Sequence, residues 1–462
     1  MTPWRSWALA LVFGAALGGV AAVAAHRQKV AAALAGPTGP PPAPGALPAH
    51  TSRLPNVVLV VGCTVRRDQA TPYGGVAAAT PFLQEMAEHG ARFDDAVTAA
   101  SWTRASMTSI VTGWPFRAVG MAEPAPTPSE RRLAPAAVTL AELLRSAGYA
   151  TFGATANPNA NAIYGFEQGF DWYSDTGALW RDGLAKIPGA RVVDGALAAI
   201  DQRTEDRPVF LQLVLLDAHQ PGPVSSQEAA VYADELAPER VWAYRALLHR
   251  FDRSVARLWS GLAARGFDDT NTVLVVVNDH GEGLQWPPEH AIGHGSQLYP
   301  STTGMVWLAR GRGIAAGHAI GGLASQIDVA PTLAALAGAT GYLGPGRDRS
   351  AELRGESANT GSERSFSDTD FQRADRSAVF APGRACEINR RADPPIERCF
   401  DRVADPYFRT PLPANDPVLL AELRAWRSEQ DAAAAAWTGT GDATPDARER
   451  EMLETIGYVQ GD

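Results

Sequence analysis

The adjacent residues Asp279 and His280 are the pair in this chain best suited to carry chemistry. They lie in the segment N-D-H-G-E-G, residues 278–283, directly after a Val-rich run at residues 272–277. A carboxylate and an imidazole together are common ligands of a divalent metal, and the nearby glycines leave room for close approach. The same two side chains could instead form a hydrogen-bonded polar turn without a metal. On these residues alone both interpretations stay open.

Two more histidines lie in polar segments of the same kind. His219 belongs to L-D-A-H-Q-P, residues 216–221, and His294 belongs to G-H-G-S-Q-L-Y, residues 293–299. Histidines that gather at strand ends can bind a metal. They can also hold an anionic ester by its oxygens and protonate its leaving group.

Hydrophobic patterning indicates the elements that would position these residues. Short apolar runs, several rich in Val, predict strands at residues 56–61, 149–154, 209–216, 272–277 and 305–309. Helical periodicity predicts helices at residues 80–90, with Thr80 able to cap, and at 139–147, 240–264 and 328–337. This alternation predicts an α/β fold with a mostly parallel central sheet flanked by helices. Ligands of such sheets bind beyond the carboxyl ends of the strands, where the polar clusters lie.

The pattern weakens after about residue 346 and predicts a smaller C-terminal α+β portion. Residues 378–380 and 399–403 are typical of short strands. Residues 432–436 form an Ala-rich, low-complexity stretch, and residues 447–456 predict a final amphipathic helix.

Taken in order, the polar clusters resemble the sulfatase family of the alkaline phosphatase superfamily. The similar segments are N-V-V-L-V-V-G-C-T-V-R-R-D (56–68), T-P-F-L-Q-E-M-A-E-H-G-A-R-F (80–93), S-W-T-R-A-S…T-G (101–113), D-A-H-Q-P (217–221), N-D-H-G-E (278–282), S-Q-I-D-V-A-P-T-L (325–333) and L-E-T-I-G-Y-V (453–459). The resemblance covers nearly everything from Asn56 to Asp462. It implies an alkaline phosphatase-like fold and a metal-assisted reaction at an ester.

The resemblance places Thr103 at the position of the family's nucleophile. Classical sulfatases carry a Cys or Ser there, later converted to formylglycine, with a Pro two residues on and an Arg two beyond. Ala105 and Met107 replace these here. Threonine cannot become formylglycine, but the related phosphoglycerol and phosphoethanolamine transferases use a metal-activated threonine directly. Thr103 therefore shifts the expected chemistry from sulfate toward phosphoryl groups, unless its hydroxyl is only a helix N-cap.

Cys63 stands where the family keeps a metal-binding aspartate. Magnesium, manganese and calcium prefer a carboxylate oxygen, whereas Cys63, Asp279 and His280 with the Thr103 oxygen would suit zinc. The alternative is a lost site in which a small cysteine packs at a strand end. The expected cofactor is one divalent metal ion: zinc, manganese, calcium or magnesium.

The resemblance implies a hydrolase or transferase that acts on a sulfate or phosphate ester through the metal-activated Thr103. His219 and His294 would contact the ester oxygens, and Arg66 would balance negative charge near the metal. The ester of a glycan or of a lipid headgroup is the expected substrate. The rival hypothesis is a non-catalytic descendant that keeps the fold as a binding or assembly module. Metal content of the purified protein would separate the two.

The N-terminal segment predicts export. Arg5 precedes an uncharged apolar run from Trp7 to Ala25, so residues 1–30 are interpreted as a signal peptide or as a single membrane anchor. Residues 31–55 are a Pro-rich linker. The catalytic domain is predicted at 56–345, and a C-terminal subdomain with a tail at 346–462. The periplasm or the cell surface is the expected location.

The net charge limits the class of binding partner, and the cysteines bear on the cellular compartment. The formal net charge is -9 and no basic stripe is visible, which argues against a nucleic-acid partner. Cys386 and Cys399 are close in sequence and are predicted to form a disulfide after export, with two free thiols as the alternative. Cys63 would then be a free cysteine.

Overall fold

The structure is a computed structural model that describes residues 54–122, 131–175, 186–220, 222–341, 343–357, 364–435, 437, 443 and 445–456. The predicted signal peptide or anchor and all but the last residues of the predicted linker lie outside these ranges. Within them, no helix has the length and apolar character that crossing a membrane requires.

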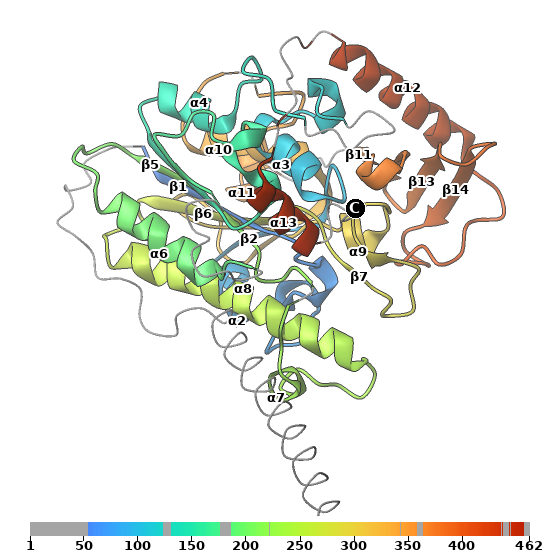
Figure 1. The fold of residues 1–462 in the computed structure, drawn as a ribbon, viewed down its shortest axis with the longest axis horizontal. Coiled ribbons are helices and arrows are strands. Elements are labelled where there is room, and N and C mark those ends of the chain that lie inside the picture. The colour runs from blue at the N-terminus through green and yellow to red at the C-terminus, as the bar shows by residue number, and fades with distance from the viewer. Residues whose placement is uncertain are drawn as a thin grey trace, which may run out of the picture.

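An 8-stranded sheet forms the centre of the fold (Figure 1). In spatial order its strands are β10 (His318–Ser325), β2 (Gly90–Val97), β9 (Trp307–Gly311), β6 (Thr272–Asn278), β1 (Asn56–Gly62), β5 (Val209–Leu215), β3 (Ala150–Thr155) and β4 (Trp172–Ser174). Strand β1 pairs in parallel with β5 and β6, and β3 with β5 and β4. Strand β9 runs antiparallel to both of its neighbours. The predicted mostly parallel α/β sheet is confirmed.

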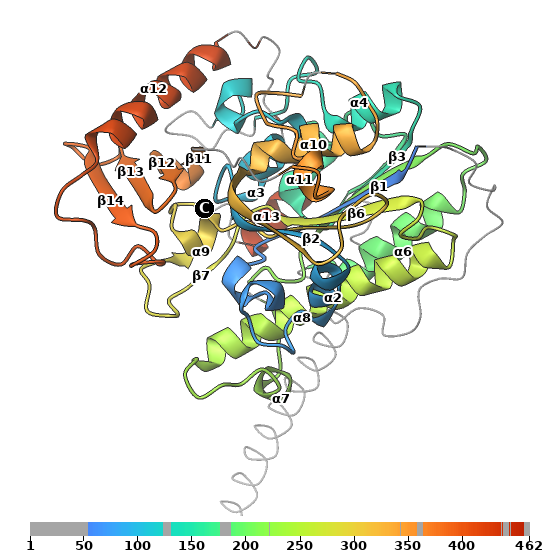
Figure 2. The same ribbon diagram turned by 180° about the vertical axis from the view of Figure 1, so that it is seen from behind.

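Helices cover both faces of this sheet (Figures 1 and 2). Helices α2 (Pro81–His89), α6 (Gly189–Ile200) and α8 (Glu239–Ala263) lie on one face, and α3 (Thr103–Thr112), α4 (Leu140–Ser146) and α10 (Val329–Leu336) on the other. Shorter helices are α7 (Ser226–Ala230), α9 (Pro300–Thr303) and α11 (Ser350–Leu353). Every residue of β1, β5 and β6 is buried between the two layers, which explains their continuous apolar sequences.

The N-terminus of α2 is capped across the fold rather than by its own Thr80. The Thr80 hydroxyl bonds Thr71 instead. The free amides of Phe82 and Leu83 donate to the carboxylate of Asp252 on α8, at 3.0 and 2.8 Å. A carboxylate at this end of a helix also interacts favourably with the helix dipole. The predicted cap at Thr80 is therefore wrong, although the predicted helix is present.

The C-terminal part forms the predicted smaller α+β portion. A 4-stranded antiparallel sheet contains β11 (Ser365–Thr369), β12 (Arg376–Ala381), β13 (Arg384–Asn389) and β14 (Ile396–Asp401). Helix α12 (Pro417–Ala434) packs against this sheet, and α13 (Ala447–Thr455) packs against the main domain. The alanines at 432–434, interpreted above as low-complexity sequence, end α12, because alanine has the highest helix propensity.

A disulfide joins the inner strand β13 of this sheet to its edge strand β14. Cys386 on β13 lies directly opposite Cys399 on β14, and the two are bridged, whereas Cys63 is a buried free cysteine. Both predictions from the sequence are confirmed.

We expect the double variant Cys386→Ala/Cys399→Ala to lose about 3 kcal/mol of unfolding free energy, because an open loop of this size gains entropy in the unfolded chain. Urea titration of the variant and the wild type measures the loss. Thiol labelling of unfolded, unreduced wild-type protein should modify Cys63 alone. Labelling of all three cysteines would contradict the pairing.

Candidate active site at the carboxyl edge of the sheet

Strand register brings Cys63 and Asp279 together. Strands β1 and β6 are parallel neighbours, with Gly62 paired to Asn278, so both chains leave the sheet side by side. His219 follows β5, the neighbour of β1 on the other side. The three sites of chemistry expected from the sequence therefore meet at one edge of the sheet.

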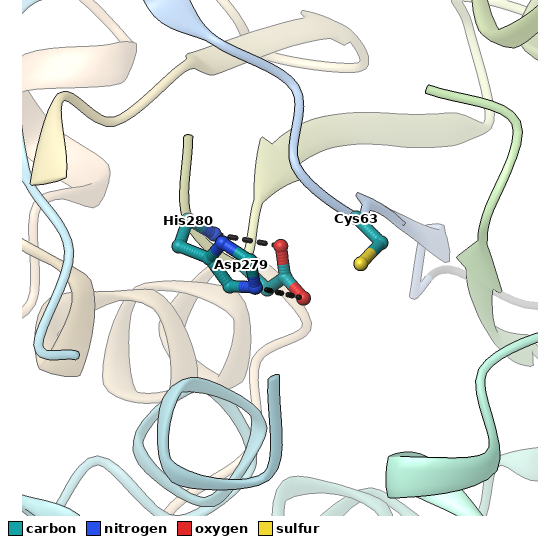
Figure 3. A group of neighbouring side chains, drawn as sticks. All are labelled: Cys63, Asp279 and His280. Carbon is teal, nitrogen blue, oxygen red and sulfur yellow. Dashed lines mark hydrogen bonds and ion pairs between the residues drawn. The ribbon is translucent and has the colours of Figure 1, made fainter. Parts of the chain in front are cut away.

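Cys63, Asp279 and His280 form a compact group of potential metal ligands (Figure 3). One ligand atom from each lies within 4.8 Å of the other two, and all three side chains are buried. Asp279 Oδ1 accepts the amides of Thr64 at 3.0 Å and of His280 at 2.7 Å. These bonds fix the carboxylate with its second oxygen, Oδ2, available to other partners.

Thr103 completes this group from the first turn of α3. Its hydroxyl donates to Asp279 Oδ2 at 2.8 Å, and its Oγ1 lies 3.5 Å from Cys63 Sγ and 3.4 Å from His280 Nε2. The N-cap position belongs to Trp102, and Thr103 is already helical. Thr103 is therefore not the N-cap of α3, which was the alternative role for its hydroxyl. The partial positive charge of the helix N-terminus lies beside the hydroxyl and favours negative charge there.

Asn157 also belongs to this group, although the sequence analysis did not single it out. Its Nδ2 donates to Thr103 Oγ1 at 3.1 Å and to Cys63 Sγ at 3.2 Å. Its Oδ1 accepts the amide of Asn159 at 2.9 Å, which fixes the orientation of the side-chain amide. Asn157 follows the predicted strand at 149–154. Treating that strand end like the other three would have found it.

The backbone around the group is held in an unusual conformation. Thr64 has a φ of 57°, a left-handed value that is costly for a β-branched residue. This conformation turns its amide toward Asp279. On the other side, Gln326 Nε2 donates to the carbonyls of Asp279 at 2.7 Å and Asn278 at 3.1 Å, while its Oε1 accepts the amide of Ala99. Strain that the surrounding contacts maintain is common at functional sites.

His280 presents a neutral ring to the group. Its Nδ1 lies 2.9 Å from the carbonyl oxygen of Gly281, an acceptor, so Nδ1 carries the proton and Nε2 keeps its lone pair. Burial lowers the pKa of His280 below its ordinary value. A neutral imidazole with Nε2 unprotonated is the form that binds metals.

His294 lies next to both His280 and His219. The ring centroids of His294 are 4.6 Å from those of His280 and 5.0 Å from those of His219. His294 Nδ1 lies 3.3 Å from both carboxylate oxygens of the buried Glu282. This contact orients the imidazole. Glu282 lies in the N-D-H-G-E-G segment, but its partner could not be read from the sequence.

Lys186 is a buried cation that the sequence analysis missed entirely. Its Nζ donates to the carbonyl oxygen of His219. Burial lowers the pKa of Lys186 to about 7, against the opposing electrostatic effect of the nearby acidic groups, among them Glu282 and Asp217. Burial, and then the charge of Lys186, lowers the pKa of His219 well below its ordinary value. Lys186 stands in no recognisable motif, so only the structure reveals it.

Arg66 has partners other than the potential metal ligands. Its Nε is 2.6 Å from Asp68 Oδ1, and its Nη1 is 2.5 Å from Glu289 Oε1. Nη1 also donates to the carbonyl oxygen of Glu282 at 3.2 Å. Two carboxylates therefore balance the charge of Arg66. The side chain anchors the segment that carries Glu282, and the predicted role of Arg66 in balancing negative charge near a metal stays a prediction.

The ligand set is chemically suited to zinc. Thiolate, imidazole and carboxylate are the usual zinc ligands in proteins, whereas magnesium and calcium require oxygen. Burial, and then the charge of Asp279, raises the pKa of the Cys63 thiol well above its ordinary value. A cation between these side chains would reverse that balance and hold the sulfur as a thiolate.

The chain is similar to proteins of known family and structure. A family model described as Sulfatase matches residues 55–339, which is more than half of the 462 residues. The curated N-acetylgalactosamine-6-O-sulfatase of Bacteroides thetaiotaomicron is 29% identical over 105 residues, or 22% of this chain and 20% of that protein. The match thus spans about a fifth of the relative's length.

Solved structures agree over a far larger part of the chain. A protein in complex with its substrate D-glucosamine-2-N,6-O-disulfate has a TM-score of 0.69 at 15% identity, covering 84% of this chain and 99% of that one. The phosphonate monoester hydrolase of Agrobacterium radiobacter has a TM-score of 0.62 at 15% identity, covering 83% and 96%. At these identities the likeness shows a shared fold. Together with the family model, it establishes that this chain belongs to the sulfatase family.

Proposed function

We propose that this chain is an ester hydrolase or transferase in which Thr103 is the nucleophile and the ester is of the phosphate or sulfate type. The observation that carries the proposal is the hydrogen bond of 2.8 Å from the Thr103 hydroxyl to Asp279 Oδ2, inside a buried group of potential metal ligands. The ring contacts of His294 with His280 and with His219, next to the Thr103 hydroxyl, further support a catalytic role for the site.

Cys63, Asp279 and His280 would hold the metal, and zinc is the ion that their donor atoms fit best. When bound, a divalent cation would favour the ionised nucleophile and offset the charge of the ester oxygens. The family membership supports such a cofactor.

The side chains of this protein supply the remaining steps. Asp279 accepts the proton of Thr103, and the Asn157 amide donates to the same Oγ1 and stabilises the developing negative charge. Oγ1 attacks the central phosphorus or sulfur, a new O–P or O–S bond forms, and the bond to the leaving oxygen breaks. His294, oriented by Glu282, would donate a proton of its own to that oxygen, while the proton from Thr103 stays on Asp279. Lys186 and His219 lie where they could bind the ester oxygens.

The use of threonine favours phosphoryl chemistry. A threonine that carries the transferred phosphoryl or sulfuryl group has no hydrated aldehyde through which that group could be eliminated. A second nucleophile must therefore displace the group in line. Water would complete a hydrolysis, and an acceptor alcohol would complete a transfer. The names of the relatives support both ester types, because one describes a sulfatase and one a phosphonate monoester hydrolase.

We expect the purified zinc-loaded protein to hydrolyse aryl phosphodiesters or phosphonate monoesters at least about tenfold faster, in kcat/KM, than aryl sulfates. A chromogenic panel of aryl sulfates, phosphomonoesters, phosphodiesters and phosphonates, with glycerol present or absent as an acceptor, measures this. Zinc removal with a chelator, followed by readdition, is the control. Turnover of none of these esters by metal-loaded protein would contradict the proposed function.

A further inference from the structure

Arg104 follows Thr103 directly on helix α3, and its side chain is buried beside the candidate site. Only 5% of this residue is exposed. The guanidinium carbon Cζ lies 3.8 Å from the ring centroid of Tyr164 and 5.6 Å from that of Trp102. Burying a cation costs free energy, and the contacts with two aromatic rings offset part of that cost. A cation is therefore held in a fixed place, one residue from the proposed nucleophile.

A hydrogen bond joins this cation to the segment that carries Asn157. Arg104 Nη2 donates to Asn159 Oδ1 at 3.0 Å, and Asn159 is fully buried. Asn159 belongs to the short 3-10 helix η4 (Pro158–Ala160), which packs against α3. A hydrogen bond with a charged donor is roughly twice as strong as a neutral one. Arg104 thus ties η4 to the helix that carries Thr103.

The same short helix orients the side chain of Asn157. Asn157 is the N-cap residue of η4, and its Oδ1 accepts the amide of Asn159 at 2.9 Å. Its Nδ2 is thereby turned toward the candidate site, where it donates to Thr103 Oγ1 at 3.1 Å and to Cys63 Sγ at 3.2 Å. Thr103 and the amide that donates to it are therefore positioned by two elements, α3 and η4, which Arg104 holds together.

We propose that Arg104 is a positioning residue, which acts through Asn159 to hold the Asn157 amide against the oxygen of Thr103. This inference rests on the proposed function, in which that amide stabilises the negative charge that develops on Oγ1. A donor that is already fixed costs no reorganisation at the moment of reaction, whereas a donor that is free to rotate must first be reoriented. Because Arg104 does not itself contact the ester, its loss should lower kcat and leave KM nearly unchanged.

The test is a double-mutant cycle, measured as kcat of the zinc-loaded protein on the best ester of the panel. Asn157→Ala removes the donor and should lower kcat about a hundredfold. Arg104→Met leaves the donor but frees it, and should lower kcat about tenfold. Because Arg104 acts through Asn157, adding Arg104→Met to Asn157→Ala should lower kcat no further. Asn159→Ala removes the acceptor of the Arg104 bond without removing a buried charge, and should reproduce the effect of Arg104→Met.

Arg310→Met is the matched control. Arg310 is likewise buried, and its guanidinium carbon lies 4.9 Å from the ring centroid of Trp259. The residue pairs with Leu274 near the start of β6, at the edge of the sheet opposite the candidate site. Its replacement should lower the thermal stability of the protein and leave kcat unchanged. Thermal unfolding of every variant establishes that it is folded at the assay temperature.

A second measurement does not depend on turnover. In protein with isotopically labelled asparagine, NMR follows the side-chain amide of Asn157, which is assigned by its absence from Asn157→Ala. Its protons should exchange with solvent at least about tenfold faster in Arg104→Met than in the wild type or in Arg310→Met, because the amide is no longer held.

Three results would overturn the inference. They are kcat effects that add in the double variant, a raised KM at unchanged kcat in Arg104→Met, and unchanged exchange at the Asn157 amide. Failure of the proposed function is recognised separately. In that case no ester of the panel is turned over, while the exchange measurement still reports whether Arg104 fixes the Asn157 amide.

Discussion

The substitution Thr103→Ala is expected to lower kcat on the preferred ester by about 10³-fold or more. It removes Oγ1, the atom that lies within 3.5 Å of side-chain atoms of Asp279, Cys63, His280 and Asn157. Loss of a nucleophile removes the covalent route, and what remains is the weaker catalysis from binding and charge stabilisation. Steady-state kinetics on the best substrate of the panel gives the ratio.

Two companion variants make this result specific. Thr103→Ser keeps a hydroxyl at the same place and should retain activity within about a hundredfold of the wild type. Thr108→Ala removes another buried hydroxyl from the same helix, one that donates only to the carbonyl oxygen of Arg104 at 2.8 Å, and should leave kcat nearly unchanged. Rapid quenching followed by mass spectrometry should find a phosphoryl or sulfuryl group on the peptide that contains Thr103. A Thr103→Ala variant within tenfold of the wild type would rule out Thr103 as the nucleophile.

The substitution Cys63→Asp is expected to move the metal preference from zinc toward manganese and magnesium. Cys63 supplies the only sulfur in a set that otherwise offers carboxylate and imidazole donors. An aspartate replaces this soft ligand by a hard anionic oxygen, which zinc tolerates and manganese and magnesium require. We expect the ratio of bound manganese to bound zinc to rise at least about tenfold, with phosphodiesterase activity that becomes dependent on manganese.

The measurement is metal content after dialysis against equimolar zinc, manganese and magnesium. Cys63→Ser is the matched control, because it restores an oxygen without the charge of a carboxylate. It should lose zinc without gaining manganese. Wild-type protein that already binds manganese stoichiometrically, together with unchanged turnover in Cys63→Ala, would show that Cys63 takes no part in metal binding.

The disulfide is relevant to the redox state of the compartment in which this protein acts. Cross-links between cysteines persist in oxidising compartments, and Cys386 and Cys399 are bridged in the C-terminal sheet.

Much of this architecture follows from local sequence pattern. The apolar runs at residues 56–61, 209–216 and 272–277 became β1, β5 and β6 almost residue for residue, because a strand buried on both faces must be continuously apolar. Parallel strands in one sheet end at one edge, so the polar residues after them had to converge. Cys63, Thr103, Asp279 and His280 could be placed together on that basis and on the family resemblance.

Only the tertiary structure decided which distant side chains complete the site and which do not. Lys186 comes from a loop with no motif, and the pairing of Glu282 with His294 closes a hairpin whose ends only meet in the fold. Arg66 lies beside the site in sequence, yet its charge is balanced by Asp68 and Glu289. Local sequence pattern encodes hydrophobic periodicity and the propensity of each segment for helix or strand. Contacts between segments hundreds of residues apart depend instead on packing of the whole molecule, which no local signal carries.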